Sequence, residues 1–172
     1  MKHRTRATAF FGICVALAMI FSYVEVLLPP IFAAVPGIKL GLANVIVIFL
    51  LYRFGVISAA TVSLLRVALV ALLFGNAVSL AYSAAGAVLS LILMILLKKT
   101  RLFSAVGVSV VGGIAHNVGQ ILMAMLLIGV AELGYYLIVL ALTGCLFGAA
   151  VGSLGALLVC RVPRLSFERN LP

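Results

Sequence analysis

The chain has 172 residues, of which 66% are hydrophobic and 9% charged, and its formal net charge is +9. A soluble domain of this size has too little interior to hide so much apolar surface, and the apolar runs are too long and continuous for a transmembrane β-barrel. The composition therefore predicts an all-α, polytopic membrane protein. Its basic residues flank the apolar runs, which is the positive-inside pattern and not a nucleic-acid-binding footprint. We therefore expect the protein to interact with the lipid bilayer and not with nucleic acid.

Six apolar segments approach the length of a transmembrane helix, which needs about 20 residues. They cover about residues 7–28, 40–52, 56–74, 77–97, 103–128 and 133–160. The first segment extends too far and lacks a clear cleavage site for a signal peptide, so a retained helix is expected. The second is short, and the Pro-rich loop 29–39 before it is expected to be partly re-entrant. We expect a single integral membrane domain over residues 1–172.

The positions of Lys and Arg predict the topology. Ten of the twelve lie on one side of the six segments, namely Lys2, Arg4, Arg6, Arg53, Lys98, Lys99, Arg101, Arg161, Arg164 and Arg169. The positive-inside rule then predicts six transmembrane helices with the N-terminus and C-terminus cytoplasmic, in a multi-pass protein of the bacterial plasma membrane. The two exceptions are Lys39, in the first opposite-side loop, and Arg66, inside the third segment.

Arg66 is the first candidate for a functional side chain. A charge near the bilayer centre costs about 2.5–3.5 kcal/mol on insertion scales, so an intramembrane Arg usually marks a pathway or a ligand. Together with Lys39 it would bind a carboxylate or phosphate in a pocket reached from outside. The other expected pocket residues supply hydrogen bonds or apolar surface: Asn44, Asn76, Tyr82, His116, Asn117 and Gln120. In the alternative interpretation, Arg66 pairs with Glu25 and the amides bond across helices.

Catalytic signatures are missing from the sequence. The chain has no Asp and three Glu, which leaves no carboxylate pair to hold magnesium, and it has no Gly-rich phosphate-binding loop. We therefore expect no enzyme activity, no cofactor and no metal site. Cys14, Cys145 and Cys160 match no metal or redox motif and are expected to be buried thiols.

Small residues recur four positions apart in two of the segments, which lets helix backbones approach closely. In the sixth segment, Gly144, Gly148 and Gly152 favour packing inside the bundle. In the first segment, Gly12 and Ala16 fit either internal packing or an exposed face that docks a membrane partner.

Three stretches of sequence carry a family resemblance: residues 36–44 (PGIKLGLAN), residues 63–66 (SLLR) with 72–75 (LLFG), and residues 112–120 (GGIAHNVGQ). They resemble the Gx transporter family, whose members are often labelled heptaprenyl diphosphate synthase component I. That family is similar to the substrate-binding S components of energy-coupling factor (ECF) transporters. In those systems a six-helix S component binds a vitamin or a related precursor, while a transmembrane T component and two ATPase subunits supply energy.

The resemblance implies an S component-like subunit that captures a small anionic or amphipathic solute, of vitamin, isoprenoid or quinone-precursor type, from outside. It also implies that Gly12 and Ala16 face the T component and that the loop 29–39 caps the site. The alternative that it leaves open is a non-catalytic membrane component associated with heptaprenyl diphosphate synthase and menaquinone biosynthesis.

Overall fold

The computed structural model describes residues 2–27 and 41–163. All regular secondary structure in this part of the chain is helical. Its elements are α1 (Lys2–Leu27), α2 (Asn44–Arg53), α3 (Val56–Phe74), α4 (Ala77–Thr100), α5 (Ala105–Ile128), the 3-10 helix η1 (Ala131–Tyr136) and α6 (Leu137–Arg161). Five helical spans are long and apolar enough to cross a membrane, and α2 is a shorter apolar helix. The prediction of an all-α, multi-pass membrane protein is therefore confirmed.

The predicted helix ends differ from the observed ones by a few residues. Helix α4 continues through Lys98 and Lys99 and ends where Arg101 adopts a left-handed conformation, with φ of 58°. The sixth segment begins as η1 and becomes α-helical only at Leu137. Short 3-10 turns are common at the ends of α-helices, and hydropathy alone does not distinguish them from α-helix.

Helix α2 forms the centre of the bundle. It packs against α1, α3, α5 and α6, and its first eight residues are all buried. A helix that is apolar on all sides belongs in a protein interior. Ten residues at 1.5 Å each extend about 15 Å, roughly half of a bilayer core. Helix α2 is therefore a central core helix that does not span the membrane by itself.

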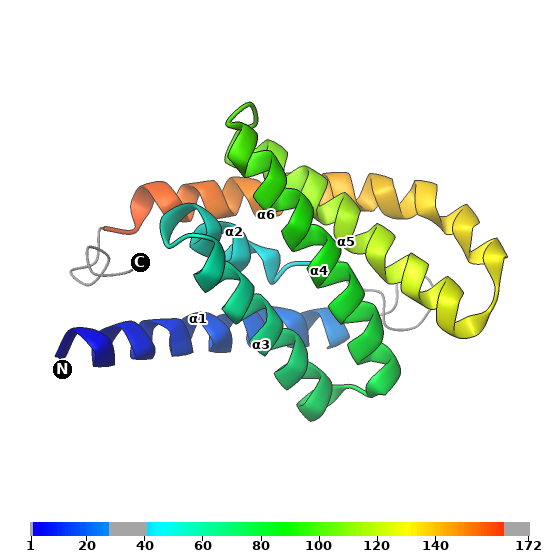
Figure 1. Cartoon of the computed structure of the whole chain (residues 1–172), viewed down its shortest axis with the longest axis horizontal. Coiled ribbons are helices and arrows are strands. Elements are labelled where there is room, and N and C mark those ends of the chain that lie inside the picture. Colours follow the sequence, from blue (N-terminus) through cyan, green and yellow to red (C-terminus); the bar gives the residue numbers. More distant parts are fainter. Residues whose placement is uncertain (1, 28–40, 164–172) are drawn as a thin grey trace.

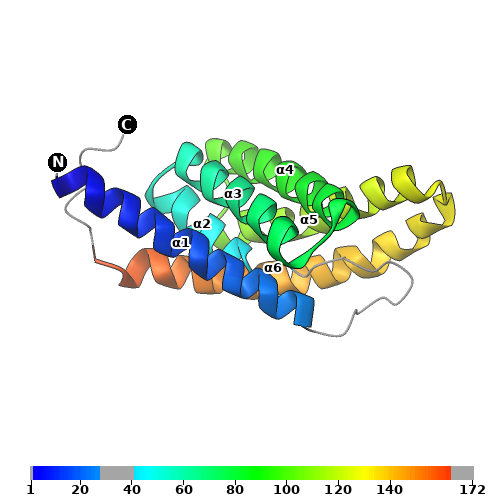
Figure 2. The ribbon, with the colours of Figure 1, turned by 90° about the horizontal axis from the view of Figure 1, so that it is seen from below.

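The other helices enclose α2 (Figures 1 and 2). Helix α5 packs along both α4 and α6, whereas α1 packs mainly against α3. The hairpin of α5 and α6 projects beyond the other helices at the end where η1 joins it. Gly144, Gly148 and Gly152 of α6 are buried, and a methyl group built on Gly113 of α5 would lie 2.5 Å from Gly144 O. These three glycines of α6 therefore pack inside the bundle, as predicted.

Four helix ends that carry basic residues lie toward the same end of the bundle: the start of α1, the α2–α3 turn, the α4–α5 turn and the end of α6 (Figures 1 and 2). Two of these basic side chains donate hydrogen bonds to backbone carbonyl groups at this end. Arg53 Nη1 donates to Val159 O at 3.0 Å, and Lys98 Nζ donates to Leu51 O at the C-terminal end of α2. The Lys98 ammonium also lies 5.2 Å from the centre of the Tyr52 ring. These bonds tie the last turn of α2 to α4 and α6.

The expectation for the thiols is wrong at two of the three cysteines. Cys14 is buried on α1, but Cys145 and Cys160 are exposed on α6. A membrane helix is apolar on its lipid-facing side as well as on its inner side, so apolar neighbours in the sequence do not imply burial.

Candidate functional site

Arg66 lies inside the helix bundle, on the inward face of α3, and is 4% exposed. Its Nη1 donates a hydrogen bond of 2.8 Å to Ser22 Oγ of α1, a side chain with no exposed surface. Its Nε and Nη2 are buried without a hydrogen-bond partner among the described residues. A guanidinium offers five N–H donors, and burying such donors unpaired is costly. Arg66 therefore retains unused capacity to bind an acceptor.

Glu25 lies one turn beyond Ser22 on the same face of α1 and is 8% exposed. Its negative charge acts on the Arg66 guanidinium. Its Oε1 accepts a hydrogen bond of 2.5 Å from the backbone N–H of Leu42. Glu25 thus connects the end of α1 to the residues that lead into α2. The alternative interpretation from sequence, in which Arg66 and Glu25 interact, describes part of this geometry, but it leaves two guanidinium nitrogens without partners.

A second group of polar side chains surrounds Gly41, which adopts φ of +86° and so requires a residue without a side chain. A methyl group built on Gly41 would lie 3.1 Å from Asn44 Nδ2 and 3.8 Å from His116 Cδ2. Gly86 of α4 approaches the same region from the other side. A methyl group there would lie 3.1 Å from His116 Cε1 and 2.9 Å from Gln120 Cγ. The backbone at these two glycines therefore passes close to the imidazole, the Asn44 amide and the Gln120 side chain, within the reach of a single added methyl group.

The two groups are joined through the short stretch before α2. Leu42 bonds to Glu25, and the preceding Gly41 lies close to Asn44 and His116. We refer to the set formed by Ser22, Glu25, Asn44, Arg66, His116 and Gln120 as the buried polar chain; all six side chains are buried. It runs from α1 and α3 across the start of α2 to α5, through an interior that is otherwise largely apolar.

Asn117 forms a hydrogen bond with the backbone of α6. Its Nδ2 donates to Leu140 O at 2.8 Å, while its Oδ1 is buried and has no hydrogen-bond partner in the part of the chain that the structure describes. Asn117 therefore holds α5 against α6, beside the buried polar chain.

Two of the remaining predicted site residues have other contacts. Tyr82 is buried against Ala124 and Leu133. Asn76 is exposed, and its side chain accepts a hydrogen bond of 2.8 Å from Ser79 N, so it caps the N-terminus of α4. Lys39 lies outside the described residues.

Sequence reasoning missed Ser22, and it considered Glu25 only as a counter-charge. A signal for both exists in hindsight. Cys14, Ala18 and Ser22 follow at intervals of four residues and Glu25 follows after three more, so all four share one helix face. All four are buried.

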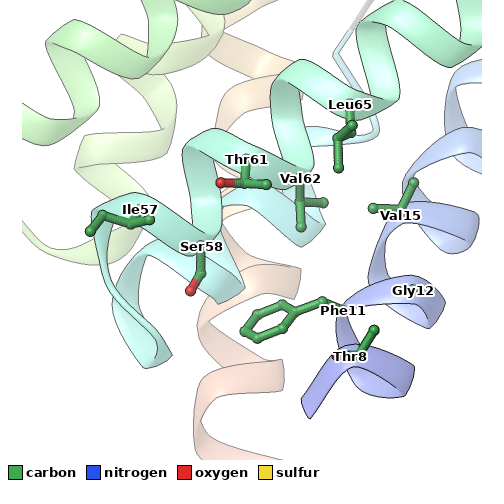
Figure 3. A pocket seen from close by; sticks show the side chains of 9 residues that line it. All are labelled: Thr8, Phe11, Gly12, Val15, Ile57, Ser58, Thr61, Val62 and Leu65. Carbon is green, nitrogen blue, oxygen red and sulfur yellow. The ribbon is translucent and has the colours of Figure 1, made fainter. Parts of the chain in front are cut away.

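The predicted docking residues lie on a different face of α1, where Gly12 and Ala16 are both exposed. Gly12 also borders an open groove of about 430 Å³ between α1 and α3. Figure 3 shows Phe11 and Val15 of α1 facing α3 across this groove. The groove is lined almost entirely by apolar surface, with a few hydroxyl groups. Helix α1 thus presents Ser22 and Glu25 toward Arg66, whereas its exposed surface combines the small residues Gly12 and Ala16 with large apolar side chains such as Ile13.

Comparison with known proteins agrees with the resemblance seen in the sequence. A family model described as heptaprenyl diphosphate synthase component I matches residues 14–158, from the middle of α1 almost to the end of α6. No curated protein sequence and no solved structure matches the chain. The match covers most of the chain, including every member of the buried polar chain, and the protein therefore belongs to the heptaprenyl diphosphate synthase component I family.

Proposed function

We propose that this protein is the substrate-binding membrane subunit, similar to an S component, of an ECF-type transporter. It captures a small anionic or amphipathic solute from outside, of vitamin, isoprenoid or quinone-precursor type. Its termini face the cytoplasm of a bacterial cell, and it performs no catalysis. The observation that supports this proposal most directly is the pair of unpartnered donors on buried Arg66.

An anion suits the Arg66 guanidinium better than any neutral group, because it accepts the free N–H donors and also neutralises the positive charge. A carboxylate or phosphate binds a guanidinium through two parallel N–H···O bonds, and Nε with Nη2 forms one of the two-pronged faces that suit such binding. Inside a membrane the alternative is a desolvated charge with unsatisfied donors. The neighbouring hydrogen-bonding groups of Asn44, His116 and Gln120 would bind the remainder of the solute.

A solute-binding subunit of this kind needs an external energy source. The sequence has no phosphate-binding loop for ATP hydrolysis. The exposed small residues Gly12 and Ala16 allow close approach of another helix. A transmembrane T component docked on this face of α1, together with two ATPase subunits, would supply the energy.

The family description supports a second candidate. A family called heptaprenyl diphosphate synthase component I suggests a non-catalytic membrane component that accompanies a soluble prenyl synthase in menaquinone biosynthesis. Affinity purification from mild detergent separates the two candidates. Two co-purifying ATPases and a transmembrane partner favour the transporter subunit, whereas a co-purifying soluble prenyl synthase favours the second candidate.

The solute site is tested with Arg66→Gln. The solute that survives purification is identified by mass spectrometry and titrated by calorimetry into the wild type and the variant. Removing one member of a buried charged pair costs about 2–5 kcal/mol, so the affinity should fall roughly 30-fold or more. Arg161→Gln is the matched control, because it removes the same charge from an exposed residue at the end of α6 and should leave binding unchanged. Normal binding by an Arg66→Gln protein that unfolds more readily would make Arg66 a structural residue and refute the site.

A further inference from the structure

The charges around Arg66 limit what the site can accept. Ser22 bonds to Arg66, and Glu25 lies one turn farther along the same face of α1, where its charge acts on the guanidinium. Arg66 and Glu25 are both buried, and their formal charges cancel.

The remaining ionisable residues change this balance by little. Lys39, wherever its ammonium lies, adds at most one positive charge, and His116 adds none in its neutral form. The other two acidic residues, Glu132 and Glu168, add no positive charge. With His116 in its neutral form, the net positive charge available to a ligand is therefore no greater than one. Each buried charge without a counter-charge carries a large desolvation penalty, so a ligand with two or more negative charges would be poorly compensated.

We propose that Glu25 is a specificity-determining residue of this site, which restricts the ligand to a single net negative charge, such as a monocarboxylate, and excludes diphosphates. This inference rests on the proposed function, in which Arg66 binds the anionic end of the solute. The inference goes beyond that function because it states which class of anion the site binds. The Glu25 carboxylate repels a second negative charge held near Arg66, because like charges interact strongly in a low-dielectric interior.

Two soluble probes with the same branched five-carbon skeleton test the inference. They are 3-methylbut-2-enoate, a monocarboxylate, and dimethylallyl diphosphate. Calorimetry on the full-length protein in detergent should give tighter binding of the carboxylate to the wild type, by at least about ten-fold. The result needs no variant. Tighter binding of the diphosphate, or binding of neither probe, overturns the inference.

Glu25→Gln then tests the residue itself. Gln retains the size of the side chain and an oxygen that accepts from Leu42 N, but it removes the negative charge. The preference for the carboxylate over the diphosphate should fall by at least about ten-fold. Glu132→Gln removes an equal charge from an exposed residue of η1 and should leave the preference unchanged. Because the readout is a ratio of two affinities on one preparation, partial loss of folded protein cancels.

The same titrations separate this inference from the proposed function. If Glu25→Gln leaves the ratio unchanged while Arg66→Gln weakens binding of the co-purified solute, the anion site stands and the role of Glu25 is refuted. If Arg66→Gln binds that solute normally, the proposed function itself fails.

Discussion

Gly86→Ala should disturb the buried polar chain through a single added methyl group. That group would lie 2.7 Å from His116 O and 2.9 Å from Gln120 Cγ, where ordinary van der Waals contact begins at 3.4 Å. The carbonyl belongs to the backbone of α5 and cannot rotate away. Helices α4 and α5 must therefore separate by several tenths of an ångström, next to the imidazole and amide proposed to bind the solute.

The magnitude follows from two opposing effects. Overpacking a well-packed interior typically costs about 1–3 kcal/mol. Replacing Gly by Ala within a helix returns about 0.8–1 kcal/mol of intrinsic helix stability. Gly12→Ala is the matched control, because it gains the same helix stability while a methyl group at Gly12 has no neighbour within 4 Å. The difference between the two variants isolates the steric cost, and we expect Gly86→Ala to be less stable than Gly12→Ala by about 1–3 kcal/mol.

Unfolding by SDS in mixed micelles, followed by circular dichroism, measures this difference. The affinity for the co-purified solute should fall in Gly86→Ala and stay at the wild-type value in Gly12→Ala. Equal stability of the two variants would show that α4 and α5 are not in the close contact described here, and would refute the reasoning.

Two further predictions concern the surroundings of the bundle. Replacing both Gly12 and Ala16 by Leu should abolish assembly with a T component, because the larger side chains prevent close helix approach. Solute binding should persist. Unchanged assembly in pull-down experiments would show that the T component docks on another surface. In a cysteine-free background, His3→Cys and Asn170→Cys should react with an impermeant thiol reagent only after the cells are permeabilised. Labelling of either position on intact cells would contradict the cytoplasmic assignment of the termini.

The membrane class and the helix positions were predictable because they depend on local composition. A helix that crosses a bilayer must be apolar for most of its length, and this property is visible in any window of about 20 residues. The third segment, predicted over residues 56–74, matches α3 in full because Gly55 and Gly75 flank it. Arg66 stood out for the same reason, as a charge in an apolar window.

The direction in which each helix faces was not predictable in this way. A membrane helix is apolar toward lipid as well as toward its neighbours, so hydrophobic periodicity is weak and does not identify the inner face. The sequence alone therefore groups Asn76 and Tyr82 with Arg66, although Asn76 caps a helix at the surface and Tyr82 packs against Leu133. Ser22 drew no attention because one hydroxyl in an apolar helix is unremarkable until its partner is known.

Composition and hydropathy were enough to predict an all-helical membrane protein, the positions of its helices along the chain, and the rare polar side chains that those helices carry. The central position of α2, the orientation of Ser22 and Glu25 toward Arg66, and the approach of Gly41 and Gly86 to His116 emerge only from the packing of the helices. The reason is physical. Transfer into a membrane depends on the composition of a segment, whereas contacts between distant residues depend on how each helix is rotated about its axis, and that rotation is set by packing.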